Sequence, residues 1–285
     1  VEPEMTWQTQ HLPNDHPRVK SGTVGVLLIN LGTPDAPDPG SVKRYLKQFL
    51  SDKRVIELPS IAWQPILRGI ILNTRPQNSA KAFSKIWTDR GSPLADITAS
   101  QAEAIAADLG QEIVVDYAMR YGSPSIEQRL TELMAKGCDR ILIAPLYPQY
   151  SAATTATVFD EVARVLGEMR CHPALRFLPP YHDDPTYLDA LADDLTRQVG
   201  ALDFKPEVML HSFHGMPLRT LERGDPYHCQ CQKSARLLRE RLSERPEFEG
   251  VRFETTFQSR FGPAKWLEPA TDDTLIAEGE KGTKR

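Results

Sequence analysis

Val24-Gly-Val-Leu-Leu-Ile-Asn-Leu31 is apolar on both side-chain faces and is too short for a buried helix. Such a run is typical of a strand buried inside a parallel sheet. Similar short runs follow along the chain, at 112–118, 140–146, 174–178, 207–213 and 251–257. Their spacing of roughly 30 residues leaves room for a helical crossover between strands. The sequence therefore predicts an α/β protein with parallel sheets flanked by helices.

The same pattern indicates two Rossmann-like domains rather than one. Prolines interrupt it at 172–182, so we place the first domain at 22–175 and the second at 176–285, after a loose tail at 1–21. Fewer strands fall in the second half. Its last residues, 278–285, are typical of a segment that precedes a strand, so we expect the second domain to be incomplete in this chain.

Two helix starts stand out between the expected strands. Ser41 is the expected N-cap of a helix whose apolar face carries Val42 and Tyr45. Asp184, followed by Pro185, has the N-cap and first-turn residues of another helix.

Composition excludes several classes of protein. The 285 residues carry 34 Lys and Arg against 38 Asp and Glu, a net charge of −4 that gives no support to a nucleic-acid partner. Four cysteines make no disulfide framework in a chain of this length, and the polar N-terminus has no signal-peptide core, so we expect a cytoplasmic location. The most apolar stretch, 61–72, is shorter than the roughly 20 residues that cross a bilayer.

Ligands of open parallel sheets bind beyond the carboxyl ends of the strands. The segments that follow four of the strands are rich in rings, hydroxyls and a few cations: 30–40, 147–155, 214–218 and 258–266. This makeup suits a large, mostly apolar ligand with a few polar groups. It does not suit a dinucleotide, because no G-x-G-x-x-G follows the first strand and no P-loop motif occurs.

His214 stands where a strand gives way to a loop, so its imidazole could face a cleft as a neutral base or as a metal ligand. A histidine hydrogen-bonded to nearby backbone is the alternative. His211, three residues earlier in the strand, points to the opposite sheet face, and we interpret it as structural.

Three other features each allow more than one interpretation. Cys229 and Cys231, with Cys138 or Cys171, could hold zinc or an iron–sulfur cluster, or they could be ordinary residues at the start of a helix. Arg75 could bind a carboxylate, or it could lie in solvent. The stretch 61–72 could line an apolar pocket or touch a membrane surface, or it could form a core helix.

Four blocks of sequence resemble the motifs of ferrochelatases in the style of proteobacterial enzymes. They occur in the expected order between about residues 24 and 275: Gly25–Pro34, Pro145–Ser151, Ser212–Pro217 with Arg223–Tyr227, and Gln258–Pro263 with Trp266–Pro269. The resemblance implies a cleft between two Rossmann-like domains in which Fe²⁺ is inserted into protoporphyrin IX, giving protoheme and two protons. The iron is then a substrate, and no resident cofactor is required.

The resemblance also implies roles for individual residues. His214 matches the active-site histidine, assigned in the family either as the proton acceptor or as a ligand of the incoming iron. Leu31 matches a position beside the metal-delivery face of the porphyrin, and Arg75 lies near an arginine linked to porphyrin binding. Further matches are cleft residues that line or grip the macrocycle, namely Tyr150, Ser151, Gln258 and Trp266.

One departure from the family pattern concerns a glutamate expected across the cleft from the histidine, on a C-terminal segment. No glutamate in this sequence matches that position, so a non-catalytic tetrapyrrole-binding module is an alternative. A chelatase for coproporphyrin or for a cobalt corrinoid precursor is another. Some members hold a [2Fe–2S] cluster, and the resemblance leaves open whether Cys229 and Cys231 contribute to one.

Overall fold

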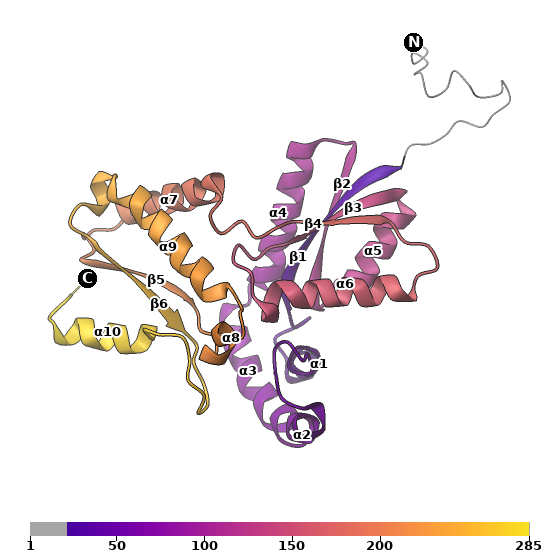
Figure 1. The fold of residues 1–285 in the computed structure, drawn as a ribbon, viewed down its shortest axis with the longest axis horizontal. Coiled ribbons are helices and arrows are strands. Elements are labelled where there is room, and N and C mark those ends of the chain that lie inside the picture. The colour runs from indigo at the N-terminus through magenta and orange to yellow at the C-terminus, as the bar shows by residue number, and fades with distance from the viewer. Residues whose placement is uncertain (1–21, 285) are drawn as a thin grey trace, which may run out of the picture.

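The computed structural model describes residues 22–284, in which strands and helices alternate (Figure 1). In chain order the elements are β1 (Thr23–Thr33), α1 (Pro39–Leu50), α2 (Ser60–Ile66), the π-helical turn η1 (Leu67–Ile71), α3 (Leu72–Ile86), α4 (Pro93–Leu109), β2 (Ile113–Gly122), α5 (Ile126–Ala135), β3 (Cys138–Pro145), the π-helical turn η2 (Ala152–Ala156), α6 (Thr157–Glu168), β4 (Ala174–Phe177), α7 (Pro185–Gly200), β5 (Val208–His214), α8 (Leu218–Glu222), α9 (Tyr227–Ser243), the short 3₁₀ turn η3 (Pro246–Phe248), β6 (Arg252–Gln258) and α10 (Thr271–Glu280). Each of the six expected strands is present. The α/β class is therefore confirmed.

The first sheet is parallel, with strand order β2-β1-β3-β4. The apolar run at 24–31 lies in its central strand, β1, which pairs with β2 on one side and with β3 on the other. Near the end of β1, Gly32 lies so close to β2 that a Cβ atom there would stand 1.7 Å from the carbonyl oxygen of Tyr121. Only a residue without a Cβ atom allows the two strands to lie this close. The φ of 109° at Gly32 is also one that glycine adopts at low cost.

Helices cover both faces of the first sheet, which explains why its strands are apolar on both sides. Leu27 and Ile29 of β1 pack on one face against α5 and α6. Val26 and Leu28 pack on the other face against α4. The alternation of these four residues places two separate hydrophobic layers around one strand.

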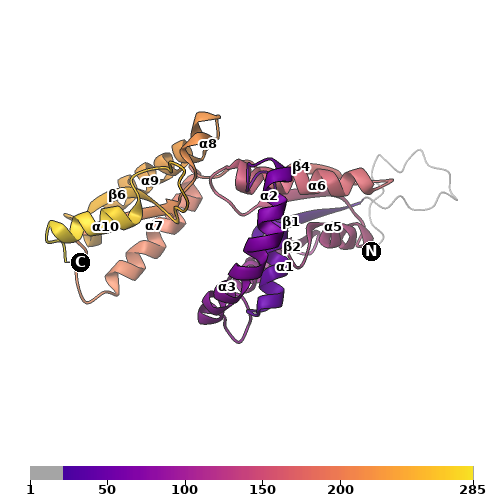
Figure 2. The ribbon, with the colours of Figure 1, turned by 90° about the horizontal axis from the view of Figure 1, so that it is seen from below.

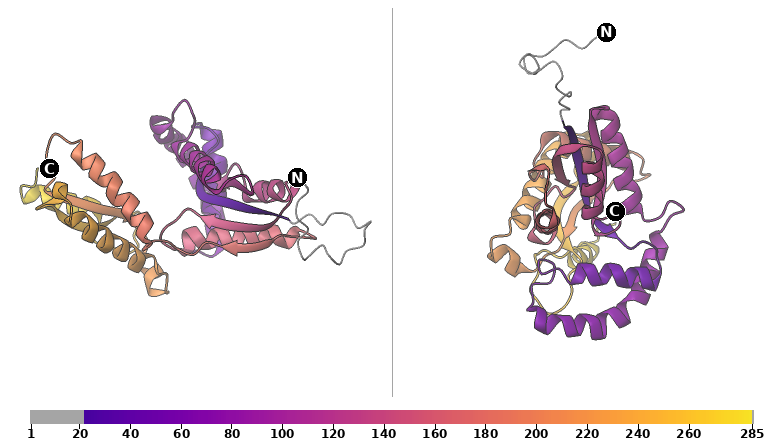
Figure 3. Two further views of the ribbon diagram at one scale, coloured as in Figure 1. Left: turned by 90° about the horizontal axis from the view of Figure 1, so that it is seen from above. Right: turned by 90° about the vertical axis from the view of Figure 1, so that its right-hand side faces the viewer.

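A helical extension precedes α4. Leu50 of α1 packs with Leu67 and Leu72, which lie in a helix that runs through α2, η1 and α3. Figures 2 and 3 show these helices projecting from one side of the first sheet. The expected N-cap of α1 is wrong: Asp38, not Ser41, accepts the hydrogen bonds from the first turn, because Pro39 at the first helical position starts the helix earlier.

The boundary between the two halves of the chain follows β4. Residues Ala174–Phe177 pair in parallel with β3, so this strand belongs to the first sheet. A division by sheet membership falls after Phe177 rather than after residue 175. The next helix, α7, begins as predicted, with the side chain of Asp184 accepting from the backbone N–H of Tyr187.

The second sheet, within residues 22–284, is the parallel pair β5-β6. Met209 and Phe253, on one face of this pair, pack against α7 and α9. On the other face the Ser212 hydroxyl lies 2.8 Å from the Thr271 hydroxyl at the start of α10. Helices therefore lie on both faces of this sheet as well. The two sheets with their helices form two groups that lie end to end in Figure 2.

Hydropathy and helix length give one further result. Among the helices of residues 22–284, none is both long enough and apolar enough to cross a membrane.

Candidate active site

His214 and Gln258 lie side by side at the carboxyl ends of β5 and β6, where they are register partners. The backbone N–H of Gly215 donates to the carbonyl oxygen of Gln258 at 2.7 Å, which extends the pairing one step beyond His214. Trp266 belongs to the same group, because its neighbouring backbone pairs with Pro217 and its ring lies against Gly215. The structure therefore brings three of the predicted site residues together, and a side chain at position 215 would separate them.

The His214 side chain is exposed at this edge of the second sheet. Surrounding protein atoms nevertheless lower the pKa of its imidazole below the usual 6.5, because they partly desolvate the charged form. The ring is therefore neutral at neutral pH. A neutral imidazole can accept a proton or bind a metal ion, and both roles predicted from the sequence require this state.

His211 lies on the opposite face of β5, as the alternation of side chains along a strand predicts. Its ring packs against Phe253 under α9, with the two ring centroids 5.7 Å apart. The two histidines therefore do not share a ligand.

Tyr150 and Ser151 follow β3 of the first sheet and contact the second half of the chain. The Tyr150 N–H donates to Gln230 Oε1 at 2.6 Å. The Ser151 hydroxyl and the Ala152 N–H both donate to Asp225 Oδ2, at 3.0 and 2.8 Å. These bonds hold the loop after β3 at the start of α9, which follows β5 and α8 in the chain.

Asp225 therefore joins the two halves of the site, although sequence reasoning gave it no role. Its second carboxylate oxygen, Oδ1, accepts from the Tyr227 N–H at 3.0 Å, so one side chain fixes both its own loop and the loop after β3. The signal was present in the sequence, since an acidic residue between Gly224 and Pro226 is typical of a turn that ends in a helix start.

Leu31 and Arg75 are not in contact with this group. Leu31 lies at the end of β1, where its N–H is bonded to the side chain of Asn30, which in turn donates to Thr98 of α4. Arg75 is exposed on α3. The structure gives Arg75 no ion pair with another residue in the range 22–284, so its guanidinium is free to bind a ligand carboxylate.

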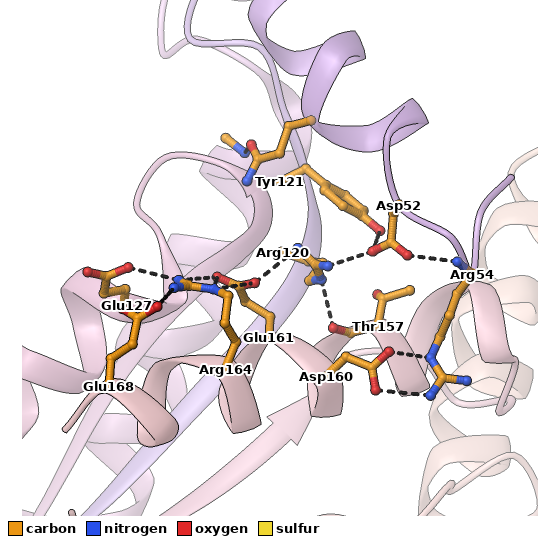
Figure 4. A network of polar contacts seen from close by, with 12 residues as sticks. Asp52, Arg54, Arg120, Tyr121, Glu127, Thr157, Asp160, Glu161, Arg164 and Glu168 are labelled. Carbon is orange, nitrogen blue, oxygen red and sulfur yellow. Dashed lines mark hydrogen bonds and ion pairs between the residues drawn. The ribbon is translucent and has the colours of Figure 1, made fainter. Parts of the chain in front are cut away.

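A buried ionic network fixes the first-sheet side of the site (Figure 4). Arg120, at the end of β2, forms an ion pair with Asp52 at 2.5 Å and donates to the backbone oxygen of Thr157 at 2.7 Å. Asp52 also accepts from the Tyr121 hydroxyl. Arg54, two residues farther along, pairs with Asp160 of α6. The network connects the loop after α1 to the start of α6. In the chain, the start of α6 follows Ser151 and η2.

The cysteines do not fit an iron–sulfur cluster. Cys229 and Cys231 lie two residues apart in α9, so they point to opposite sides of the helix, Cys229 into solvent and Cys231 into the core. Burial raises the pKa of the Cys231 thiol to about 12, which disfavours the thiolate that a metal needs. Within residues 22–284, no three His, Cys, Asp or Glu side chains gather as metal ligands. No step proposed below uses a cluster.

Comparison with known proteins identifies the family. The family model described as Ferrochelatase matches residues 23–285. A ferrochelatase from Allorhizobium ampelinum is 53% identical over 285 residues, covering 99% of this chain and 82% of the relative. One from Rhizobium meliloti is 53% identical, with 95% of this chain and 80% of the relative covered, and one from Nitrobacter hamburgensis is 50% identical, with 92% and 76% covered. The chain belongs to the ferrochelatase family.

Proposed function

We propose that this chain inserts ferrous iron into protoporphyrin IX to form protoheme. In this reaction Fe²⁺ forms bonds to the four pyrrole nitrogens, and the two pyrrole N–H bonds break to release two protons. No electrons are transferred. The protein must therefore hold a flat apolar ring, admit the iron and accept protons.

The observation that carries this proposal is the neutral, exposed imidazole of His214 at the carboxyl edge of the second sheet. A base with a pKa below 6.5 is ready to accept a proton at neutral pH, and its exposure lets it pass that proton to water. We assign His214 the role of proton acceptor. A buried, charged histidine could do neither.

The residues around His214 are suited to hold the macrocycle. Trp266 offers a ring against Gly215, the residue after the histidine, and Gln258 offers an amide at the same edge. Tyr150 and Ser151 approach from the first sheet, held there by Gln230 and Asp225. In this proposal Trp266, Gln258 and Tyr150 line the porphyrin, and the buried Ser151 holds the loop that carries Tyr150 through its bond to Asp225. Leu31 lies beside the metal-delivery face, and Arg75 binds a propionate carboxylate as a bidentate donor.

The proposal is tested by mixing the protein anaerobically with Fe²⁺ and protoporphyrin IX and following metalloporphyrin absorbance. Loss of the base in His214→Ala is expected to lower kcat by about 10²–10⁴-fold. Porphyrin binding, measured by fluorescence quenching, is expected to persist, because the rings that hold the macrocycle are unchanged. The matched control is His172→Ala, which removes an exposed histidine from the loop before β4 and leaves kcat unchanged.

Two outcomes would contradict the assignment. If His214→Ala metallates protoporphyrin at the rate of the unmodified protein, His214 is not the proton acceptor. If the unmodified protein quenches porphyrin fluorescence but forms no metalloporphyrin, it is a binding module instead. Parallel assays with coproporphyrin establish which porphyrin is preferred.

We also propose that the 61–72 segment touches a membrane surface without crossing it. Ile61, Ile66 and Ile70 are exposed there, with 89%, 44% and 59% of their surface in contact with solvent. Apolar side chains gathered on one segment favour burial at a lipid interface. Double substitution Ile66→Ser/Ile70→Ser is expected to reduce cosedimentation with anionic vesicles, whereas Ile276→Ser, an exposed isoleucine on α10, is not. Equal sedimentation of all forms would reject the contact.

A cytoplasmic location stays a prediction from the sequence. The four cysteines, all within the described residues, are free thiols, which is compatible with a reducing compartment.

A further inference from the structure

A cavity of about 410 Å³ lies between α9 and the second sheet, on the face of β5 opposite to His214. Two groups of side chains line it. The strands contribute His211, Phe253 and Thr255, and α9 contributes Gln232, Lys233, Ala235, Arg236 and Arg239. Six of these eight side chains carry hydrogen-bond donors, and three of the six are cations. The proposed metallation reaction uses none of them.

The cations of this cavity are not equally neutralised. Lys233 pairs with Asp183 at 2.5 Å, and Arg236 pairs with Glu240 at 2.7 Å. Arg239 has no ion pair with any residue in the described part of the chain. The wall of the cavity therefore has one positive charge without a partner, and its exposed guanidinium can reorient to meet a ligand.

His211 provides a second unpartnered group in the same cavity. Its Nε2 is buried, and no hydrogen-bond partner for it lies within residues 22–284. Burial and the nearby positive charge of Arg239 lower the pKa of this imidazole to about 4, so the ring is neutral. A neutral ring can still donate through Nε2–H. Buried polar groups in folded proteins nearly always have a partner, so this nitrogen indicates a ligand or ordered water.

We propose that this cavity binds a small oxyanion, a phosphate or carboxylate group of a soluble metabolite, between the Arg239 guanidinium and His211 Nε2. The guanidinium supplies the charge and two parallel donors, which match two oxygens of such a group. The imidazole supplies a neutral donor at the sheet. Lys233, Arg236 and Gln232 line the rim, where they can bind further oxygens of the same molecule.

Calorimetric titration at low salt tests the proposal, with inorganic phosphate and citrate as the two probes. Binding of either probe is expected in the unmodified protein, and the tighter of the two identifies the kind of oxyanion. Arg239→Gln is expected to weaken binding by about tenfold or more, because a hydrogen bond to a charged group is lost. The matched control is Arg241→Gln, on the same helix, whose guanidinium pairs with Asp189 of α7 outside the cavity. Its affinity is expected to stay within about twofold of the unmodified protein.

A spectroscopic readout separates a local effect from a change in overall charge. The Nε2 resonance of His211, observed by nitrogen NMR, is expected to shift when the probe binds and to stay unchanged in Arg239→Gln at the same probe concentration. The proposal is overturned if neither probe binds the unmodified protein, if the two arginine variants bind equally, or if the probe binds while the His211 resonance does not move. In each of these cases the partner of Nε2 is water.

Discussion

The carboxyl ends of the two sheets hold their polar side chains in opposite ways. Beside the first sheet, Arg120 and Asp52 form an ion pair in which the two side chains are only 9% and 11% exposed. At the end of the second sheet, His214 and Gln258 are exposed and paired through their backbones alone. The first sheet uses charge to fix loops. The carboxyl end of the second sheet presents uncharged groups to the ligand of the site.

This difference explains how a reactive group can be exposed and still be well placed. The network around Arg120 fixes the loop after α1 and the start of α6, and Asp225 then holds the loop after β3 against the second half of the chain. His214 itself needs few contacts, because the strand pairing of β5 and β6 positions its backbone. Rigid support and chemistry are thus assigned to different residues.

The largest expected effect comes from breaking the buried pair of the first sheet. Asp52→Ala leaves the Arg120 guanidinium buried without its carboxylate, and the free energy of unfolding is expected to fall by about 3–5 kcal/mol. Urea unfolding followed by circular dichroism measures it. The control is Asp194→Ala, which removes an exposed ion pair with Arg197 on α7 and is expected to cost at most about 1 kcal/mol. Similar losses in both variants would mean that burial of the pair is unimportant.

A smaller effect is expected at the contact between the two halves. Asp225→Ala removes the acceptor for the Ser151 hydroxyl and the Ala152 N–H, and we expect a loss of about 1.5–3 kcal/mol in unfolding free energy. Because Ser151 holds the loop that carries Tyr150 in the proposed porphyrin site, KM for protoporphyrin should rise more than kcat falls. Asp225→Asn keeps one amide oxygen and is expected to recover part of both losses. An unchanged KM in Asp225→Ala would show that this contact does not position the site.

The smallest effect is expected at Glu57, which bridges the same two halves from the surface. Its carboxylate lies 3.0 Å from Arg223 and 3.6 Å from Arg219, and both arginines are exposed. Glu57→Gln is therefore expected to change the unfolding free energy by at most about 1 kcal/mol, and less at high salt. A loss as large as that of Asp225→Ala would place the main link between the halves at the surface instead.

The sequence predicted the strands well because their signal is local. The run at 24–31 is apolar on both faces, and only a strand covered on both sides buries such a run. The start of α1 was harder to predict from the sequence, since Asp38 and Ser41 are both good N-cap residues. The position of Pro39 decides between them. The strand at 174–178 could not be assigned to a sheet, because pairing with β3 is a tertiary choice.

The candidate site was predictable only in part. His214, Gln258 and Trp266 follow the ends of two strands, and parallel strands bring such positions together. Arg120 and Asp52 were missed, because a residue that acts through contacts distant in sequence leaves no local pattern. Asp225 left a turn pattern, but that pattern does not show its hydrogen bonds to Ser151 and Ala152. Arg120 did leave a hint, since an arginine directly after an apolar strand run needs a buried partner.

If a neutral His214 accepts the pyrrole protons, the rate of metallation must depend on pH through the titration of this imidazole. Because the pKa of His214 is lowered, the neutral form prevails above that pKa, and the rate should be lost as pH falls through it. We expect kcat/KM of the unmodified protein, which reports groups of the free protein, to fall with an inflection below pH 6.5, and we expect His214→Ala to lack this inflection along with most of its rate. An identical inflection in His214→Ala, with the rate preserved, would show that His214 is not the proton acceptor.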